Sequence, residues 1–405
     1  MKEEEKTHNP WVRLRNWNAG QTEKEDKVEE IFSDPNDLRL FDHDLHLQAK
    51  IKGHLYESQS TTIDLSNNST WNKNWDVLQV PVTDNCNLLC KHCPRESKYL
   101  RKDISLENFK KYLSRFSPEN FESLLLSDFG EPLIRTDLIE ILRYVKTRNF
   151  KHVQIVTTGS LLNDKWCKSI VEENLLQQVL ISIEASSKEL YEYIRGSDFD
   201  LMKTNVKRLV DYKKSTGSPY PVLYFNAVCL KKNIDELPGI MDLAHELGIN
   251  YVYFVHLNAV PSDIYKDRRE ELSDKLYFED QHLNTCDREH IERVFKEIDR
   301  KSKEYQIPYL PPEEYLAVKQ PDIEESKSEE KKGCHMPYSW SQVDPEGNVY
   351  PCCQISRRYS VGNLNDQNFK EIWNSEKFVE FREGLTNGKP NRWCEVCNVY
   401  NGKRF

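Results

Sequence analysis

Three cysteines in the first quarter of the chain stand at a spacing that suits metal chemistry. Cys86, Cys90 and Cys93 form a CxxxCxxC pattern directly after an apolar, alternating segment. Three thiolates on one tight loop suit a soft metal or an iron–sulfur cluster, because a compact loop lets the three sulfurs face one centre. A fourth ligand is missing locally. In a cubane of four irons, three cysteines leave one iron open to a small chelating molecule, and chemistry can take place there.

This spacing resembles the radical S-adenosylmethionine (SAM) superfamily, whose CxxxCxxC loop follows the first strand of a partial β/α barrel. The resemblance implies a 4Fe-4S cluster on Cys86, Cys90 and Cys93, with SAM chelating the open iron through its amino and carboxylate groups. It also implies that one electron from the cluster cleaves SAM to methionine and a 5′-deoxyadenosyl radical, which takes a hydrogen atom from the substrate. The alternatives are a zinc knuckle or three unrelated thiols; further family features along the chain argue against both.

Composition and charge exclude several classes of partner. The chain has 405 residues, enough for two or three domains, and a formal net charge of -9. Such a field repels a phosphate backbone, so no nucleic-acid partner is expected. No run approaches the roughly 18 apolar residues of a spanning helix, and the start has no apolar core of a signal peptide. We therefore expect a cytoplasmic protein without a membrane partner, in which metal ligation explains the count of eleven cysteines better than disulfides do.

Four regions are predicted. Residues 1–72 are polar and weakly periodic and form an N-terminal extension; 73–258 form the radical SAM partial barrel; 259–333 are a charged linker with helices; 334–405 are a cysteine-rich auxiliary-cluster domain. The predicted strands span 76–82, 123–127, 152–157, 178–184, 222–229 and 251–257, and the helices between them 105–116, 136–148, 163–173, 188–213 and 234–247. This alternation implies parallel βαβ units. With the resemblance, it predicts an α/β fold, a partial (β/α)6 TIM-type barrel whose site lies at the C-terminal strand ends.

Two turns after predicted strands resemble SAM-binding motifs. Ser127 to Pro132 reads Ser-Asp-Phe-Gly-Glu-Pro, similar to the family's Gly-Gly-Glu-Pro, whose backbone receives the SAM amino group. Phe129 replaces the first glycine, while Gly130 still allows a close backbone approach. The turn Thr157 to Leu162 is similar to the Thr-Asn-Gly-x-x-Leu turn of relatives. The resemblance makes these residues candidates for binding the cofactor: His92 in the cysteine loop, Gly130, Glu131, Pro132 and Thr158.

The fourth predicted strand ends with Ser182 and Glu184, where relatives use a serine for the SAM carboxylate and an acid nearby. Alternation puts both side chains on one face. If that face is inward, the carboxylate is costly unless it has a partner. Arg195 is the expected partner: the family places there an arginine that binds the methionine carboxylate of SAM, and a guanidinium forks naturally onto a carboxylate. The alternative is a surface arginine.

Two further residues are substrate candidates. Asn226 on the fifth predicted strand and His256 on the sixth are placed to reach the cavity, although a lone histidine at a strand end is more often structural. No catalytic base is identified from the sequence.

A second group of cysteines occupies the C-terminal region. Cys352 follows Gly347 by five residues in a predicted hairpin, and Gly-Asn-Leu at 362–364 and Ile-Trp at 372–373 precede a final CxxC. These features resemble the SPASM/twitch region of radical SAM enzymes. The resemblance implies a second 4Fe-4S cluster, ligated by Cys334, Cys352, Cys394 and Cys397, with Cys353 spare. Full thiolate ligation suits an electron conduit. A zinc site on the same cysteines is the alternative.

A second cluster favours net oxidation. Hydrogen abstraction leaves a carbon radical, and removal of one more electron with a proton gives a ketone, an imine or an unsaturated bond. The leading prediction is a radical SAM oxidoreductase that dehydrogenates a small polar metabolite such as a sugar or cyclitol, supplied with electrons by a reducing protein such as flavodoxin or ferredoxin. One alternative is a maturase that crosslinks or epimerises a ribosomal peptide or protein. Another is a non-catalytic metal-binding protein, which would need no SAM pocket.

Overall fold

The computed structural model describes residues 75–93, 102–257, 274–312, 334, 336–355, 357–395 and 397. These residues all belong to one compact unit, Asp64–Phe405. The predicted N-terminal extension 1–72 lies outside the described residues, as do 259–273 and 313–333 of the predicted linker. Within the described ranges, no helix is both long and apolar enough to cross a membrane.

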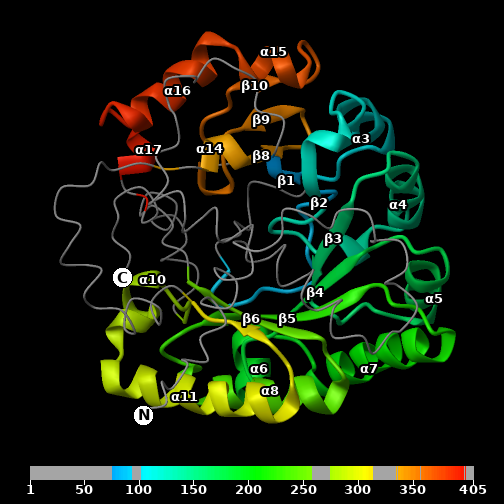
Figure 1. The fold of residues 1–405 in the computed structure, drawn as a ribbon, viewed down its shortest axis with the longest axis vertical. Helices are drawn as coiled ribbons and strands as arrows, with labels where there is room; N and C mark the ends of the chain where they lie inside the picture. The colour runs from blue at the N-terminus through cyan, green and yellow to red at the C-terminus, as the bar shows by residue number, and fades with distance from the viewer. Residues whose placement is uncertain are drawn as a thin grey trace, which may run out of the picture. The chain divides into compact units, whose positions relative to one another are not determined.

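One continuous sheet of ten strands, in the order β10-β9-β8-β1-β2-β3-β4-β5-β6-β7, organises the described residues (Figure 1). Its central strands are β1 (Trp75–Gln79), β2 (Phe121–Leu125), β3 (His152–Thr157), β4 (Gln178–Ser182), β5 (Val222–Cys229) and β6 (Tyr251–His256). They pair in parallel in chain order. The predicted α/β fold with six parallel strands is therefore confirmed.

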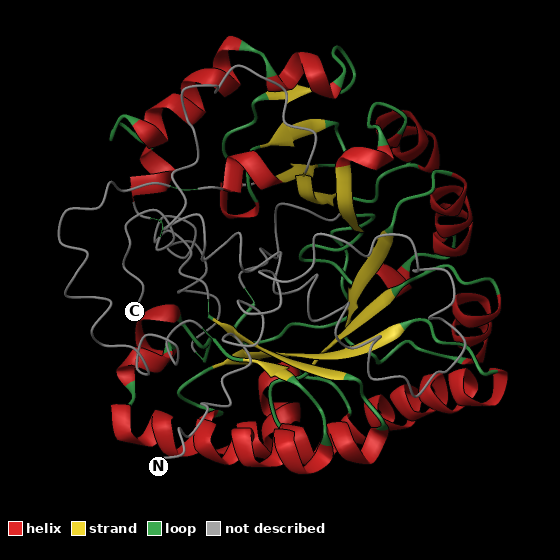
Figure 2. Ribbon diagram, in the orientation of Figure 1, coloured by secondary structure: helices red, strands yellow, loops and turns green. Residues whose placement is uncertain are grey.

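Helices pack on the outer face of these strands, as Figure 2 shows. They are α3 (Leu106–Leu113), α4 (Leu138–Thr147), α5 (Asp164–Glu172), α6 (Lys188–Arg195), α7 (Phe199–Thr216) and α8 (Leu237–Leu247). The single helix predicted over 188–213 is wrong: α6 and α7 are separate. Gly196 ends α6 with φ at 65°, which a glycine adopts without steric cost. Asp198 then begins α7 by accepting a hydrogen bond from the Leu201 amide.

Strand alternation divides the side chains between a helix-covered face and an inner face. On β4, Val179 and Ile181 are fully buried in the core that the helices cover. Ser182 lies on the opposite face, which continues to Glu184 beyond the strand. The same parity on β5 places Phe225 in the core and Asn226 on the inner face. The barrel interior therefore presents polar groups at the C-terminal ends of its strands.

The described part of the predicted linker contains more than helices. Helices α10 (Phe278–Gln281) and α11 (Arg288–Tyr305) are followed by β7 (Tyr309–Leu310), which pairs in parallel with β6. The sequence did not predict this seventh parallel strand, because two residues are too few to show an alternating pattern.

The cysteine-rich region joins the barrel sheet itself. Strand β8 (Trp340–Val343) pairs in parallel with β1, and β9 (Asn348–Tyr350) and β10 (Gly362–Asn363) continue the sheet in antiparallel fashion. Its helices are α14 (Met336–Ser339), α15 (Phe369–Trp373), α16 (Glu376–Thr386) and α17 (Arg392–Glu395). Phe369 packs its ring against Phe116 and Phe121, with centroids 4.8 and 6.0 Å apart. The two cysteine groups are thus carried by one sheet.

Candidate functional site

The first three cysteines lie on the loop that follows β1. The backbone of this loop is anchored at Lys91, whose amide donates to the carbonyl of Ile194 at 2.8 Å. The ammonium of Lys275 donates to the carbonyl oxygens of Cys90 and Cys93, at 3.3 and 3.1 Å. These bonds hold the loop in one conformation between α6 and the segment before α10, and so limit where the sulfurs can point.

The thiols of this loop suit a cluster. All are free of disulfides. Burial raises the pKa of Cys90 to about 11, and Cys93 is close enough to raise it further electrostatically. Among the described residues, no three His, Cys, Asp or Glu side chains are grouped so as to hold one metal ion. Three thiols on one loop suit three corners of a cubane.

Gly130 lies directly against the cysteine loop. A Cβ atom at this position would lie 2.2 Å from the carbonyl oxygen of Thr83 and 2.9 Å from that of Asn85. The next amide, of Glu131, donates to the same Asn85 oxygen at 2.8 Å. A side chain at position 130 would therefore collide with the loop that carries the cysteines, and the glycine lets the two backbones meet.

The Glu131 carboxylate ties two strand ends together. It accepts hydrogen bonds from the Leu133 amide at 3.0 Å, the Thr157 hydroxyl at 2.8 Å and the Thr158 amide at 2.6 Å. Its burial raises its pKa, and these donors oppose that effect. The Leu133 bond also begins the short 3-10 turn Pro132–Ile134. Glu131 thus holds the loop after β2 against the loop after β3.

Thr158 belongs to a second set of contacts between the same loops. Its hydroxyl lies 2.8 Å from the Ser160 hydroxyl, which accepts a hydrogen bond from Asn87 of the cysteine loop at 3.0 Å. The residues predicted from the Gly-Glu-Pro and Thr-Thr-Gly motifs therefore meet beside the cysteines.

Glu184 and Arg195 form a buried ion pair, with Arg195 Nη1 2.8 Å from Glu184 Oε2. Their exposed fractions are 1% and 4%. His92 Nε2 is 3.7 Å from the other carboxylate oxygen, and burial lowers the pKa of His92, which favours the neutral imidazole. Arg195 Nε and His92 Nδ1 are buried and have no hydrogen-bond partner among the described residues. These two nitrogens, beside the cysteine loop, fit an anionic group such as the SAM carboxylate.

The two substrate candidates are placed differently. Asn226 is the direct neighbour of Ser182 across β4 and β5, and both are partly exposed on the inner face. On β6, His256 pairs with Cys229 of β5, which is buried in the helix-covered core. Its side chain lies on the same face of the sheet as that of the buried Phe254. This placement supports Asn226 as a residue that faces the cavity and gives no support to His256.

The second group of cysteines is assembled from three separate segments: Cys334, Cys352 after β9, and Cys394 with Cys397 around α17. The thiols are free of disulfides. Burial is the main cause of the raised pKa of Cys334, and the nearby thiols of Cys352, Cys397 and Cys394 raise it further. Burial likewise raises the pKa of Cys352 to about 12. Four free thiols that interact with one another fit the four corners of a fully ligated cluster.

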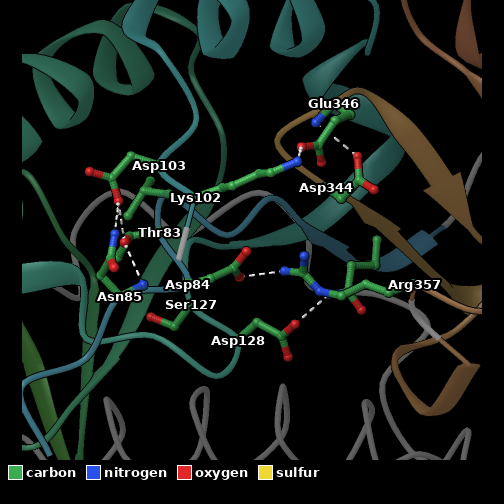
Figure 3. A network of polar contacts seen from close by, with 12 residues as sticks. Thr83, Asp84, Asn85, Lys102, Asp103, Ser127, Asp128, Asp344, Glu346 and Arg357 are labelled. Atoms are coloured by element: carbon green, nitrogen blue, oxygen red, sulfur yellow. Dashed lines mark hydrogen bonds and ion pairs between the residues drawn. The ribbon is translucent and has the colours of Figure 1, made fainter. Parts of the chain in front are cut away.

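A charged network that the sequence did not predict links the two cysteine regions (Figure 3). Arg357, four residues after Cys353, donates a hydrogen bond to Asp84 and interacts electrostatically with Asp128. Gln342 on β8 donates to Asp128 at 2.7 Å. Burial raises the pKa of Asp84 to about 6 and that of Asp128 to about 7, while Arg357 opposes both shifts.

The network joins three loops. Asp84 precedes Cys86 by two residues, Asp128 precedes Gly130 by two, and Arg357 comes from the cysteine-rich region. Polar residues at two successive strand ends were a usable signal for the two aspartates. Arg357 left no signal, because it lies 273 positions from Asp84 along the chain.

Comparisons with known proteins agree with this arrangement. Residues 80–244 match the radical SAM superfamily, and residues 334–398 match the SPASM iron–sulfur cluster-binding domain. The chain is 26% identical to an AdoMet-dependent heme synthase of Methanosarcina barkeri over 317 residues, which cover 75% of this chain and 83% of that protein. It is 24% identical to an AdoMet-dependent heme synthase of Oleidesulfovibrio alaskensis, over 80% of this chain and 81% of that protein.

Two solved structures share the fold. Streptococcus suis SuiB bound to precursor peptide SuiA aligns with a TM-score of 0.58 and 14% identity, over 83% of this chain and 72% of SuiB. The structure of anSMEcpe with bound AdoMet aligns with a TM-score of 0.53 and 16% identity, over 80% of this chain and 87% of that one. With two cysteine groups on one partial barrel and these matches over both regions, the chain belongs to the radical SAM superfamily and carries a C-terminal SPASM iron–sulfur domain.

Proposed function

We propose that this protein is a radical SAM oxidoreductase that dehydrogenates a small polar metabolite, such as a sugar or a cyclitol. When bound, the first cluster and SAM supply a 5′-deoxyadenosyl radical, which removes a hydrogen atom from the substrate. The chain's own residues hold and orient these groups. Cys86, Cys90 and Cys93 would ligate the cluster, and the loop at Gly130 would present its backbone to the SAM amino group.

Arg195 is the residue we propose for the SAM carboxylate. Its Nη1 is already engaged by Glu184, so the guanidinium is fixed in direction, and its Nε still lacks a partner among the described residues. A fixed guanidinium with a free donor binds a carboxylate at low entropic cost. His92, held neutral by burial, would donate or accept one further hydrogen bond beside it.

The convergence of Cys334, Cys352, Cys394 and Cys397 carries the proposal of oxidation. A fully thiolate-ligated cluster has no open iron for substrate, so its natural role is to take up or pass on an electron. Removal of a hydrogen atom by the radical and of one electron by this cluster, with loss of a proton, is a two-electron oxidation.

The choice of a small substrate has its own support. The two relatives described above, similar over three quarters or more of this chain, are heme synthases. The compound in their name is a small molecule and not a peptide. The inner face offers Asn226, beside the SAM-binding candidate Ser182, to a substrate with hydroxyl groups. A peptide maturase is the second candidate, because a SuiB structure with its precursor peptide shares the fold.

Metal analysis tests the chemistry. After anaerobic reconstitution, iron, sulfide and zinc are measured per chain in the wild type and in the Cys86/Cys90/Cys93→Ala variant. We expect about eight irons falling to about four, with loss of all 5′-deoxyadenosine production. Four irons with one zinc would make the C-terminal site structural and remove the electron acceptor. Unchanged iron in the variant would contradict the radical mechanism.

Substrate class is tested separately. The reconstituted protein is incubated with SAM and panels of polyols, cyclitols and candidate precursor peptides, and 5′-deoxyadenosine is measured beside the oxidised product. Stimulation by a polyol, with a carbonyl product that is two hydrogens lighter, supports the dehydrogenase. Stimulation only by a peptide encoded in a neighbouring reading frame would favour the maturase.

A further inference from the structure

An exposed apolar patch lies beside the first cysteine loop. Leu89, between Cys86 and Cys90, is 72% exposed, and Tyr193 on α6 is 41% exposed. Both border a hollow of about 360 Å³, whose lining also includes Lys91 and Lys275. Water-exposed large apolar side chains grouped in this way are typical of a surface that binds another molecule. The proposed chemistry inside the barrel makes no use of them.

Lysines surround the aromatic ring of this patch. The ammonium of Lys91 is 4.4 Å from the centre of the Tyr193 ring, and that of Lys232, in the loop after β5, is 5.3 Å from it. With Lys275 these make three cations around Leu89 and Tyr193, and we call the five residues the Leu89–Tyr193 patch. A cation close to an aromatic ring is attracted to its face, and tyrosine is enriched at protein interfaces.

The acids near the patch compensate only part of this charge. Asp274 pairs with Lys91, and Glu192 accepts a hydrogen bond from the Phe199 amide. No carboxylate among the described residues pairs with Lys232. Counted over the described residues alone, three lysines stand against Asp274 and Glu192, so the patch is locally basic in a chain whose formal net charge is -9, and a partner recognised by charge at this place must be acidic.

The patch is also physically continuous with the first cluster site. Leu89 and Lys91 are covalent neighbours of Cys90, and Lys275 contacts the carbonyls of Cys90 and Cys93. The amide of Lys91 is bonded to Ile194, the residue that follows Tyr193. Because electron transfer between proteins slows steeply with distance, a donor that serves the first cluster must dock where the cysteine loop reaches the surface.

We propose that the Leu89–Tyr193 patch is the docking surface for a small acidic electron-carrier protein of the flavodoxin or ferredoxin class, which reduces the cluster on Cys86, Cys90 and Cys93. The inference rests on the proposed function, since a SAM-cleaving cluster needs a reductant. One electron leaves the reduced carrier and one enters the cluster, and no bond forms or breaks in this step. Leu89 and Tyr193 supply apolar contact, and the lysines orient the acidic carrier.

The test compares two sources of electrons for the same reaction. The variant is Tyr193→Ala/Lys232→Glu, which changes the patch without altering a cysteine, Arg195 or Glu184. The matched control is Lys168→Glu on α5, an exposed lysine outside the patch that undergoes the same charge reversal. Production of 5′-deoxyadenosine from SAM is measured with dithionite and, separately, with a flavodoxin kept reduced by its reductase, at low and high salt.

We expect the variant to match the wild type with dithionite and to fall on the order of tenfold in kcat/KM for flavodoxin at low salt. High salt should shrink the gap, because it screens the lysines. Lys168→Glu should behave as wild type with both donors. Binding of oxidised flavodoxin, followed by calorimetry, should weaken in the variant alone, which gives a readout that does not depend on turnover.

Equal rates and equal binding of flavodoxin in variant and wild type, with dithionite activity intact, would overturn the docking surface while leaving the proposed function standing. Absence of SAM cleavage by the wild type with either donor would instead overturn the proposed function. If the double variant also loses activity with dithionite, the single variant Lys232→Glu is tested in its place, because Lys232 lies in a loop and its substitution disturbs the fold less. Binding of the wild type to a second copy of itself or to a peptide, but not to the carrier, would also contradict the proposal.

Discussion

The two cysteine regions are built in opposite ways. Cys86, Cys90 and Cys93 come from one loop of eight residues, whose shape depends on nearby anchors such as Lys275. Cys334, Cys352, Cys394 and Cys397 come from three segments spread over 64 residues, and they meet only when β8, β9 and α17 are in place. The first site is therefore a local structure that a strand end presents, whereas the second is a product of folding. We expect metal at the second site to stabilise the fold and metal at the first to affect it little.

The charged contacts divide in the same way. Near the first site, Glu184 and Arg195 lie 11 residues apart and form a deeply buried pair. Between the two sites, Asp84, Asp128 and Arg357 form a network from distant segments, with one guanidinium for two carboxylates. Arg357 also has φ at 64°, a left-handed conformation that costs a non-glycine residue roughly 1 kcal/mol.

The sharpest test of the comparison is a pair of neighbouring cysteines. Cys352→Ala should lose about four irons, because Cys352 interacts with both Cys334 and Cys394. Cys353→Ala should retain its iron, because Cys353 interacts electrostatically with two of the proposed ligands, Cys352 and Cys397, whereas Cys352 interacts with all three of the others. Iron and sulfide per chain decide between the two. The reverse result would make Cys353 the ligand.

Arg195→Gln should cost about 3–5 kcal/mol in the free energy of unfolding, because it leaves the Glu184 carboxylate buried without its partner. Urea unfolding of the cluster-free protein measures this. SAM binding to the reconstituted protein should weaken as well. Lys207→Gln, which breaks the exposed pair with Asp211 on α7, is the control and should leave both quantities near the wild type. Equally small effects would mean that Glu184 finds another donor.

Arg357→Gln should have a smaller effect, about 2 kcal/mol, because Arg357 and Asp128 retain some contact with solvent. Its control crosses the same junction at the surface: Lys102→Gln breaks the ion pair with Glu346 and should leave the free energy of unfolding unchanged. Thermal and urea unfolding measure both. If the two variants are equally harmless, the network does not join the regions energetically.

Asp128→Asn should change how stability depends on pH. Burial raises the pKa of Asp128 from 3.8 to about 7 in the folded protein. Below about pH 4 the carboxyl is protonated in both states and contributes no difference. Between pH 4 and 7 the unfolded chain releases the proton first, so the folded wild type loses stability as pH rises, and the loss is constant above pH 7. The variant should lack this loss, which is on the order of 1–2 kcal/mol after allowing for partial exposure. Parallel stability curves for variant and wild type between pH 4 and 8 would contradict the raised pKa.

The sequence alone predicted what depends on local pattern. The six parallel strands follow from alternating apolar residues and turn signals, and β3 and β5 were predicted to the residue. The motifs around Cys86, Gly130 and Thr158 were recognisable because each is a short run at a strand end. The cost of burying an unpaired carboxylate called for a partner of Glu184, and the family resemblance pointed to Arg195.

Only the tertiary structure decided the rest. The pairing of β8 with β1, the short strand β7 and the Arg357 network depend on contacts between residues more than 50 positions apart, which leave no periodic trace in the chain. The division of 188–213 into two helices depended on one glycine that adopts a positive φ. Residue types and their spacing therefore predict the local sites. Which distant segments contact one another is determined by how the sheet closes and packs.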